Sequence, residues 1–154
     1  MLASKISCLL VLSLAFLLGA LLVVPSQGQS WAAFKNKHID SKSQYPPHNM
    51  NLYCENQIRN RRMTSPRCKP HNTFISAPAS IQAVCGPAGE PTVGDLRESN
   101  SSFPLTLCKL YRGSWAPDCN YIGTSAVNRI IIACEDGYPV HLETEVPGYM
   151  ELEE

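Results

Sequence analysis

The chain has 154 residues, and its 13 Lys and Arg balance its 13 Asp and Glu. This composition excludes the strongly basic balance of many nucleic-acid binders and the charge-rich, apolar-poor balance of a disordered chain. The length is that of about one domain. Cysteine stands out, with one residue near the start and six after position 50. Six cysteines in a compact secreted chain are typical of three disulfide bonds.

The first 28 residues have the pattern of a secretory signal peptide: an early lysine, an apolar run over residues 8–24 and a small-residue end. The apolar run is also nearly long enough for a membrane anchor. Pro25 and the lack of a following basic cluster favour cleavage instead. We therefore predict a secreted protein that begins near Gln29 and has no stable membrane insertion after cleavage.

The early part of the mature chain is predicted to be helical. Residues 31–40 are expected to form a short helix in which Phe34 and His38, four apart, share a face. Residues 51–60 are expected to form a second helix. Its apolar side chains expected to face inward are Leu52, Cys54 and Ile58. A third helix is predicted over residues 76–85, where a proline suits the first turn.

The later part of the chain is predicted to be extended. Residues 67–75 are predicted to be extended. Residues 86–95 are rich in glycine and proline and are predicted to be a loop. Turn signals separate three expected strands, which cover residues 103–111, 127–134 and 138–142. Helices that come first and strands that follow favour an α+β fold with an antiparallel sheet. The domain is expected to span residues 29–146, and residues 147–154 to form an acidic, poorly ordered tail.

The mature cysteines are Cys54, Cys68, Cys85, Cys108, Cys119 and Cys134. Their spacing alone leaves the disulfide pairing open. Zinc binding is the alternative for such cysteines. It is disfavoured because the sequence has no Cys-x-x-Cys pair and the secretory route is oxidising.

Histidine is the side chain that titrates nearest to neutral pH, and two histidines facing one phosphate can act as base and acid in the same reaction. The candidates are His38, His48, His71 and His141. A lysine, Lys69, follows a cysteine that a disulfide would hold in place. A lone histidine is more often structural, so we assign no chemistry to His48 or His71.

Together, these features resemble the vertebrate pancreatic-type ribonucleases. The matching pieces occur in family order over nearly all of residues 31–144: Phe34, Lys37-His38-Ile39-Asp40, Tyr53-Cys54, Cys68-Lys69, Asn72-Thr73-Phe74, Ala133-Cys134-Glu135 and Pro139-Val140-His141. The combination is specific, whereas each piece alone would be weak. The chain lacks a fourth cysteine pair, and Leu142 follows the Pro139-Val140-His141 motif. In both features the chain resembles the angiogenin branch of this family.

The resemblance implies a V-shaped antiparallel sheet with three helices and a substrate cleft. It also implies a monomer that needs no metal or other cofactor. The implied disulfide pairs are Cys54 with Cys108, Cys68 with Cys119, and Cys85 with Cys134.

The resemblance further implies an endoribonuclease that cleaves RNA on the 3′ side of pyrimidines and forms a 2′,3′-cyclic phosphate. His38 would be the general base, His141 the general acid, and Lys69 would stabilise charge on the phosphoryl oxygens. Thr73 would read the pyrimidine through its backbone amide and its hydroxyl. The full set of expected substrate-binding residues is Lys37, Asn72, Thr73, Glu135 and Leu142.

Two departures from the family pattern bear on activity. Lys37 stands where the family usually has a glutamine, and a cation there is expected to lower the pKa of His38. Thr144 stands where angiogenin-like members have a glutamine that obstructs the pyrimidine pocket, which implies a more open pocket.

An alternative function is an extracellular signalling protein, angiogenic in character, or a host-defence protein, whose effect needs binding more than turnover. The resemblance also implies capture by the ribonuclease inhibitor and binding to a cell-surface receptor.

Overall fold

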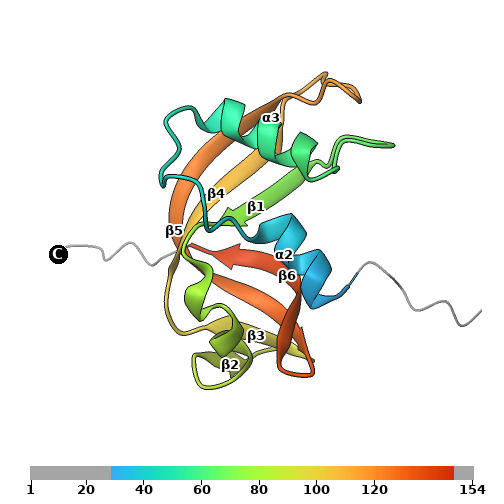
Figure 1. Ribbon diagram of the computed structural model, residues 1–154. Coiled ribbons are helices and arrows are strands. Elements are labelled where there is room, and N and C mark those ends of the chain that lie inside the picture. The colour runs from blue at the N-terminus through green and yellow to red at the C-terminus, as the bar shows by residue number, and fades with distance from the viewer. Residues whose placement is uncertain (1–28, 148–154) are drawn as a thin grey trace, which may run out of the picture.

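The computed structural model describes residues 29–147 (Figure 1). The elements in chain order are α2 (Trp31–His38), α3 (Met50–Asn60), β1 (His71–Ile75), the 3-10 helices η1 (Pro78–Ser80) and η2 (Gln82–Cys85), β2 (Gly89–Pro91), β3 (Leu96–Ser99), β4 (Phe103–Leu110), β5 (Tyr121–Glu135) and β6 (Tyr138–Val146). The predicted signal peptide and nearly all of the predicted tail lie outside the described residues. Within residues 29–147, no helix is long and apolar enough to cross a bilayer.

The long strand β5 organises the sheet. Its first half pairs with β4, and its second half pairs with β3 and β6, all antiparallel. The path runs β1-β4-β5-β3-β2, with β6 joined to β5. In Figure 1, β5 curves from one half of the molecule to the other, while α3 packs on the upper half and α2 lies between β1 and β6. The predicted α+β fold with an antiparallel sheet is confirmed.

Local capping explains where the two α-helices begin. The Ser30 side chain accepts a hydrogen bond from the Ala33 amide, and the Asn49 side chain accepts one from the Leu52 amide. Serine and asparagine are favoured at this position because they satisfy amides that have no partner within the helix.

The prediction for the inward face of α3 is wrong in one residue. Cys54 and Ile58 are fully buried, but Leu52 is 49% exposed. Cys54 and Ile58 are four apart and therefore share a face, whereas a residue two positions from Cys54 points elsewhere. Leu52 is thus on the side of the helix that the core does not cover.

The predicted third helix is present as the two short 3-10 helices, η1 and η2. Ile81 and Val84 are three apart and both are buried. A spacing of three places side chains above one another in a 3-10 helix, so this geometry directs both into the core.

The predicted loop over residues 86–95 is partly wrong, because it contains the short strand β2, which pairs with the unpredicted β3. Gly89 shows why glycine is needed there. A Cβ at this position would collide with the Val84 backbone carbonyl. Strands this short are stabilised mainly by their neighbours, so the sequence carries little signal for them.

The three predicted disulfides are present and anchor separate parts of the fold. The structure joins Cys54 to Cys108, Cys68 to Cys119, and Cys85 to Cys134, which are the pairs that the resemblance implies. They link residues 54, 51 and 49 positions apart. In the chain-entropy model, each such loop contributes on the order of 4 kcal/mol to stability.

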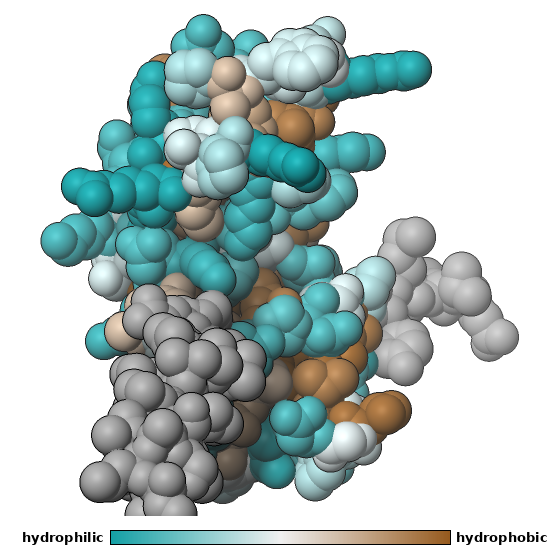
Figure 2. Space-filling model, turned by 90° about the vertical axis from the view of Figure 1, so that its right-hand side faces the viewer, coloured by the Kyte–Doolittle hydropathy of each residue, from teal (hydrophilic) through white to brown (hydrophobic). Residues whose placement is uncertain are grey.

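Two groups of buried side chains fill the interior. One lies around Phe34, Ile75 and Leu105, and the other around Ile58, Phe74 and Tyr121. Hydrophilic side chains cover most of the face seen in Figure 2, and hydrophobic side chains lie in smaller patches between them. Burial of Phe34 agrees with its position on the inward face of α2.

Candidate active site

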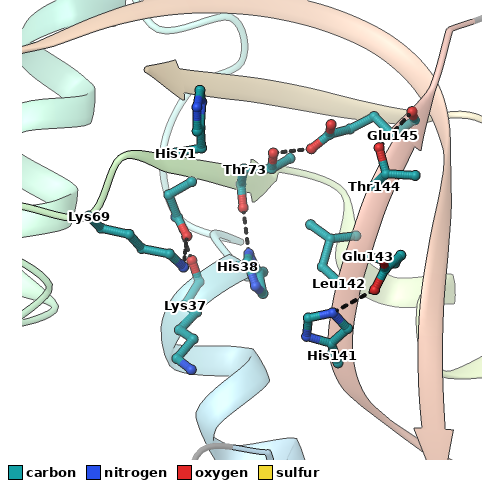
Figure 3. Close-up of a pocket in the computed structure, with 11 residues that line it drawn as sticks. Lys37, His38, Lys69, His71, Thr73, His141, Leu142, Glu143, Thr144 and Glu145 are labelled. Carbon is teal, nitrogen blue, oxygen red and sulfur yellow. Dashed lines mark hydrogen bonds and ion pairs between the residues drawn. The ribbon is translucent and has the colours of Figure 1, made fainter. Parts of the chain in front are cut away.

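A cleft of about 340 Å³ lies where α2, β1 and β6 meet (Figure 3). His38, Lys69 and His141 all line it, although they come from three distant segments. The other predicted residues that line it are Lys37, Asn72, Thr73 and Leu142. Glu135 is exposed at the end of β5 and is not among the lining residues.

His38 is the last residue of α2 and is 8% exposed. Its Nδ1 lies 2.9 Å from the carbonyl oxygen of Thr73. A carbonyl can only accept, so Nδ1 carries the proton and Nε2 has a free lone pair. Burial is the main cause that lowers the His38 pKa to about 4; the nearby charges of Lys69 and Lys37 also lower it, and the Thr73 hydrogen bond opposes the shift. His38 is therefore neutral and basic at neutral pH.

The pairing of β1 with β4 explains why the Thr73 carbonyl can reach His38. Backbone bonds join Pro70 to Leu110 and Ser76 to Pro104 at the two ends of β1. Hydrogen-bonded positions alternate along an antiparallel pair, so the backbone groups of the even-numbered residues of β1 bond to β4. The amide and carbonyl of Thr73 consequently point away from β4, toward the cleft.

A single buried amide, that of Asn72, positions two parts of the site. Its Oδ1 accepts a hydrogen bond of 2.7 Å from Lys69 Nζ, and its Nδ2 donates one of 2.7 Å to the Lys37 carbonyl. Asn72 therefore joins the lysine ammonium to the end of α2. Burial, and secondly the Lys37 charge, lower the pKa of Lys69 to about 8. At neutral pH the ammonium still predominates.

His141 lies on β6 with its ring half-exposed, and Glu143 binds it. The distance from His141 Nε2 to Glu143 Oε2 is 2.9 Å. A carboxylate only accepts, so Nε2 donates and Nδ1 is the nitrogen left for a ligand. Sequence reasoning did not identify Glu143. The available signal was its spacing, because residues two apart on a strand share a face.

The Thr73 side chain forms a contact that the sequence did not predict. Its hydroxyl donates to the Glu145 carboxylate across the cleft (Figure 3). The more open pyrimidine pocket expected from Thr144 stays a prediction, and the residue that bonds the Thr73 hydroxyl is the neighbouring Glu145. The side chain of Thr144 itself is exposed.

Two further side chains hold the end of α2 in place. Arg61 Nη1 donates to the backbone carbonyls of Asn36 and Ile39, each at 2.8 Å. A cation at this position satisfies carbonyls that the helix leaves free and is favourable to the helix dipole. Tyr53 Oη donates to Asp40 at 2.6 Å. Both contacts stabilise the backbone next to His38, and sequence reasoning did not identify the role of Arg61.

The remaining histidines divide between the cleft and the surface. His71 lines the cleft, although the sequence assigned it no chemistry, and His48 is exposed outside the lining residues. Within residues 29–147, no group of three or more His, Cys, Asp or Glu side chains is arranged to hold a metal ion.

We expect Lys37→Gln to move the acidic side of the pH–rate profile to higher pH. Burial is the main cause that lowers the pKa of His38 to about 4, and the Lys37 charge adds to this lowering. Without that charge, the pKa of His38 rises. On acidification, His38 therefore becomes protonated, and can no longer act as a base, at a higher pH than in the wild type. The measurement is kcat/KM, which reports the free enzyme, across roughly pH 3 to 10.

The matched control is Lys42→Gln, which removes an exposed lysine that does not line the cleft. Its profile should coincide with that of the wild type at the same ionic strength. Identical profiles for Lys37→Gln and the wild type would contradict the electrostatic role of Lys37.

The fold, the disulfides and the cleft define the class of protein. The family model described as pancreatic ribonuclease matches residues 29–143, and the chain belongs to this family of ribonucleases. A ribonuclease from Chelonia mydas is 45% identical over 114 residues, which cover 73% of this chain and 95% of that protein. Angiogenin from Saimiri sciureus is 40% identical over 141 residues, which cover 88% and 94% of the two chains.

A solved structure agrees with this assignment. The crystal structure of green turtle egg white ribonuclease is similar to this fold with a TM-score of 0.69 and 42% sequence identity. The similarity covers 75% of this chain and 98% of that one. Both ribonucleases and angiogenins are therefore relatives of this protein.

Proposed function

We propose that this protein is a secreted endoribonuclease that cleaves RNA on the 3′ side of pyrimidines by transphosphorylation. The observation that supports it most is the arrangement of His38, Lys69 and His141 around one cleft. We further propose that residues 1–28 are a signal peptide, that residues 29–146 form the ribonuclease domain, and that an acidic tail follows.

In the proposed reaction, Nε2 of His38 takes the proton from the ribose 2′-hydroxyl. The 2′-oxygen then attacks the adjacent phosphorus and forms the new P–O bond. The bond from phosphorus to the 5′-oxygen breaks, and His141 Nδ1 gives that oxygen its proton. The products are a 2′,3′-cyclic phosphate and a free 5′-hydroxyl. A base and an acid of this kind each contribute about 10²- to 10⁴-fold to a rate.

Lys69 supplies the proposed electrostatic part of the mechanism. Charge accumulates on the non-bridging phosphoryl oxygens in the transition state, and a fixed ammonium stabilises it without reorganisation. The hydrogen bond to Asn72 Oδ1 supports this role, because it holds Nζ in place before substrate arrives. The positive charge of Lys37 would add attraction for the same phosphate.

The proposed base-binding pocket lies beside the reaction centre. Thr73 offers a backbone amide that points toward the cleft and a hydroxyl, the two groups needed to bond a pyrimidine. Leu142 lines the same cleft and offers apolar contact. A second cavity of about 370 Å³ also includes Thr73 in its lining. We propose that Glu135, outside the cleft, contacts the base downstream of the cleaved bond.

The direct test is to identify the products of the mature protein. Uridylyl-adenosine and cytidylyl-adenosine should each yield a 2′,3′-cyclic phosphate, which phosphorus NMR detects. Adenylyl-adenosine should not react. The matched control is the 2′-deoxy form of the uridine substrate, which lacks the attacking hydroxyl and should stay intact. Cleavage of the deoxy substrate, or a 3′-phosphate that appears without a cyclic precursor, would overturn the mechanism.

The second candidate function is extracellular signalling or host defence with dispensable turnover. It is favoured by the similarity to angiogenin, which extends over 88% of this chain. A cell-surface receptor and the ribonuclease inhibitor would then be its partners, and the protein would act as a monomer. An endothelial growth assay and a bacterial killing assay with His141→Ala separate the two functions. A retained effect would favour binding over catalysis.

A further inference from the structure

The hydrogen bond between Thr73 and Glu145 connects two parts of the sheet that are not neighbours. Thr73 lies on β1, which pairs with β4, whereas Glu145 lies on β6, which pairs with β5. Both residues line the two adjoining cavities of about 340 and 370 Å³. In Figure 3, the carbonyl of Thr73 points toward His38 and its hydroxyl points toward Glu145. The bond therefore stands at the proposed base-binding position.

This bond determines what the Thr73 hydroxyl can offer to a ligand. A hydroxyl has one proton and two lone pairs, and an ionised carboxylate has no proton to give. The Thr73 proton is therefore committed to Glu145. Toward the cleft, the hydroxyl oxygen can act only as an acceptor. Glu143 does not compete for this proton, because its carboxylate binds His141.

We propose that Glu145 makes the protein prefer uracil to cytosine, an inference that rests on the proposed ribonuclease function. The two bases differ at N3, which carries a hydrogen in uracil and a lone pair in cytosine. An acceptor at Thr73 bonds the uracil N3–H directly. Cytosine N3 would face a lone pair, unless Thr73 breaks its bond to Glu145 and turns its proton inward.

The Thr73 backbone amide does not contribute to this preference. Uracil and cytosine both carry a carbonyl oxygen at position 2, so an amide donor binds them equally. Thr73 is 7% exposed, so a mismatched hydroxyl there has little access to water. Leaving a buried polar group unpaired costs more than a hydrogen bond contributes. Glu145 thus acts as a positioning residue for Thr73 and does not itself need to touch the base.

The test compares uridylyl-adenosine with cytidylyl-adenosine as substrates for the wild type and Glu145→Ala. The ratio of kcat/KM for uridine over cytidine should exceed one in the wild type. In the variant, where the Thr73 hydroxyl turns freely, the ratio should fall about tenfold, as loss of a hydrogen bond to a charged group predicts. Glu90→Ala is the matched control, because it removes an exposed glutamate on β2 and should leave the ratio unchanged.

Binding of uridine 3′-phosphate and cytidine 3′-phosphate, measured by titration calorimetry, separates this inference from the proposed function. Wild-type protein that cleaves neither dinucleotide contradicts the ribonuclease proposal, whatever the binding data show. Wild-type protein that binds both nucleotides equally, or a ratio that Glu145→Ala leaves unchanged, overturns the role of Glu145. An equal rise in kcat/KM for both substrates in Glu145→Ala also overturns it, because the Glu145 carboxylate would then only obstruct the pocket.

Discussion

His38→Ala and His141→Ala should each lower kcat/KM for uridylyl-adenosine by about 10³-fold or more, because each removes one partner in the proposed general acid–base catalysis. His38 is buried and neutral, with Nδ1 bonded to the Thr73 carbonyl, so alanine removes the proposed base. His141 has its Nε2 bonded to Glu143, and alanine removes the proposed proton donor.

A substrate with an activated leaving group distinguishes the two histidines. In uridine 3′-(4-nitrophenyl phosphate), the leaving oxygen needs no proton, so general acid catalysis contributes little. His141→Ala should recover most of its lost activity on this substrate, whereas His38→Ala should stay impaired. Equal losses for both variants on both substrates would contradict the assignment of base and acid.

The matched control for both variants is His48→Ala, which removes an exposed histidine outside the cleft and should keep full activity. Thermal unfolding of all three variants shows whether a lost rate reflects a lost fold. His38 requires this control most, because it is buried against Phe34 with ring centroids 5.1 Å apart.

Lys69→Ala should lower kcat by about 10²- to 10³-fold, as the removal of one preorganised charge partner of the transition state does in other enzymes. KM should change much less, because the ammonium is expected to bind the transition state more strongly than the ground state. The measurement is the separate determination of kcat and KM for uridylyl-adenosine. A loss confined to KM would show that Lys69 only binds the ground-state phosphate.

Asn72→Ala is the companion variant for Lys69. It keeps the ammonium but removes both the 2.7 Å contact to Nζ and the 2.7 Å contact to the Lys37 carbonyl. Its effect on kcat should have the same direction as that of Lys69→Ala but be smaller, because the charge remains near the cleft. The matched control is Lys42→Ala, which removes a lysine outside the cleft and should leave both constants unchanged.

Local signals were sufficient for the helices and most of the sheet. Residues 31–40 were predicted to form a helix in which Phe34 and His38 share a face, and this four-residue spacing is a local property of the chain. The same kind of signal failed for β2 and β3, which include glycine, proline and charged residues in runs of three and four. Their pairing partners, rather than their own propensities, hold them in the extended conformation.

The candidate site divides in the same way. The sequence singled out His38, Lys69 and His141 by residue type and order, and the structure brings all three to one cleft. It did not identify Glu143 or Glu145, because their roles depend on which face of β6 turns toward the cleft and on what lies opposite. An acidic run near the end of a chain usually indicates only a solvated segment.

The sequence by itself determined the family, the set of cysteines and the side chains able to transfer protons. These depend on residue identity and order along the chain. Only the tertiary structure decided that Glu145 bonds Thr73, that Arg61 caps α2 and that Asn72 bridges Lys69 to the Lys37 carbonyl. Each contact joins groups that the chain separates and the folded sheet brings together. Hydrogen bonds act only over about 3 Å, so a linear sequence does not show which partners come within that distance.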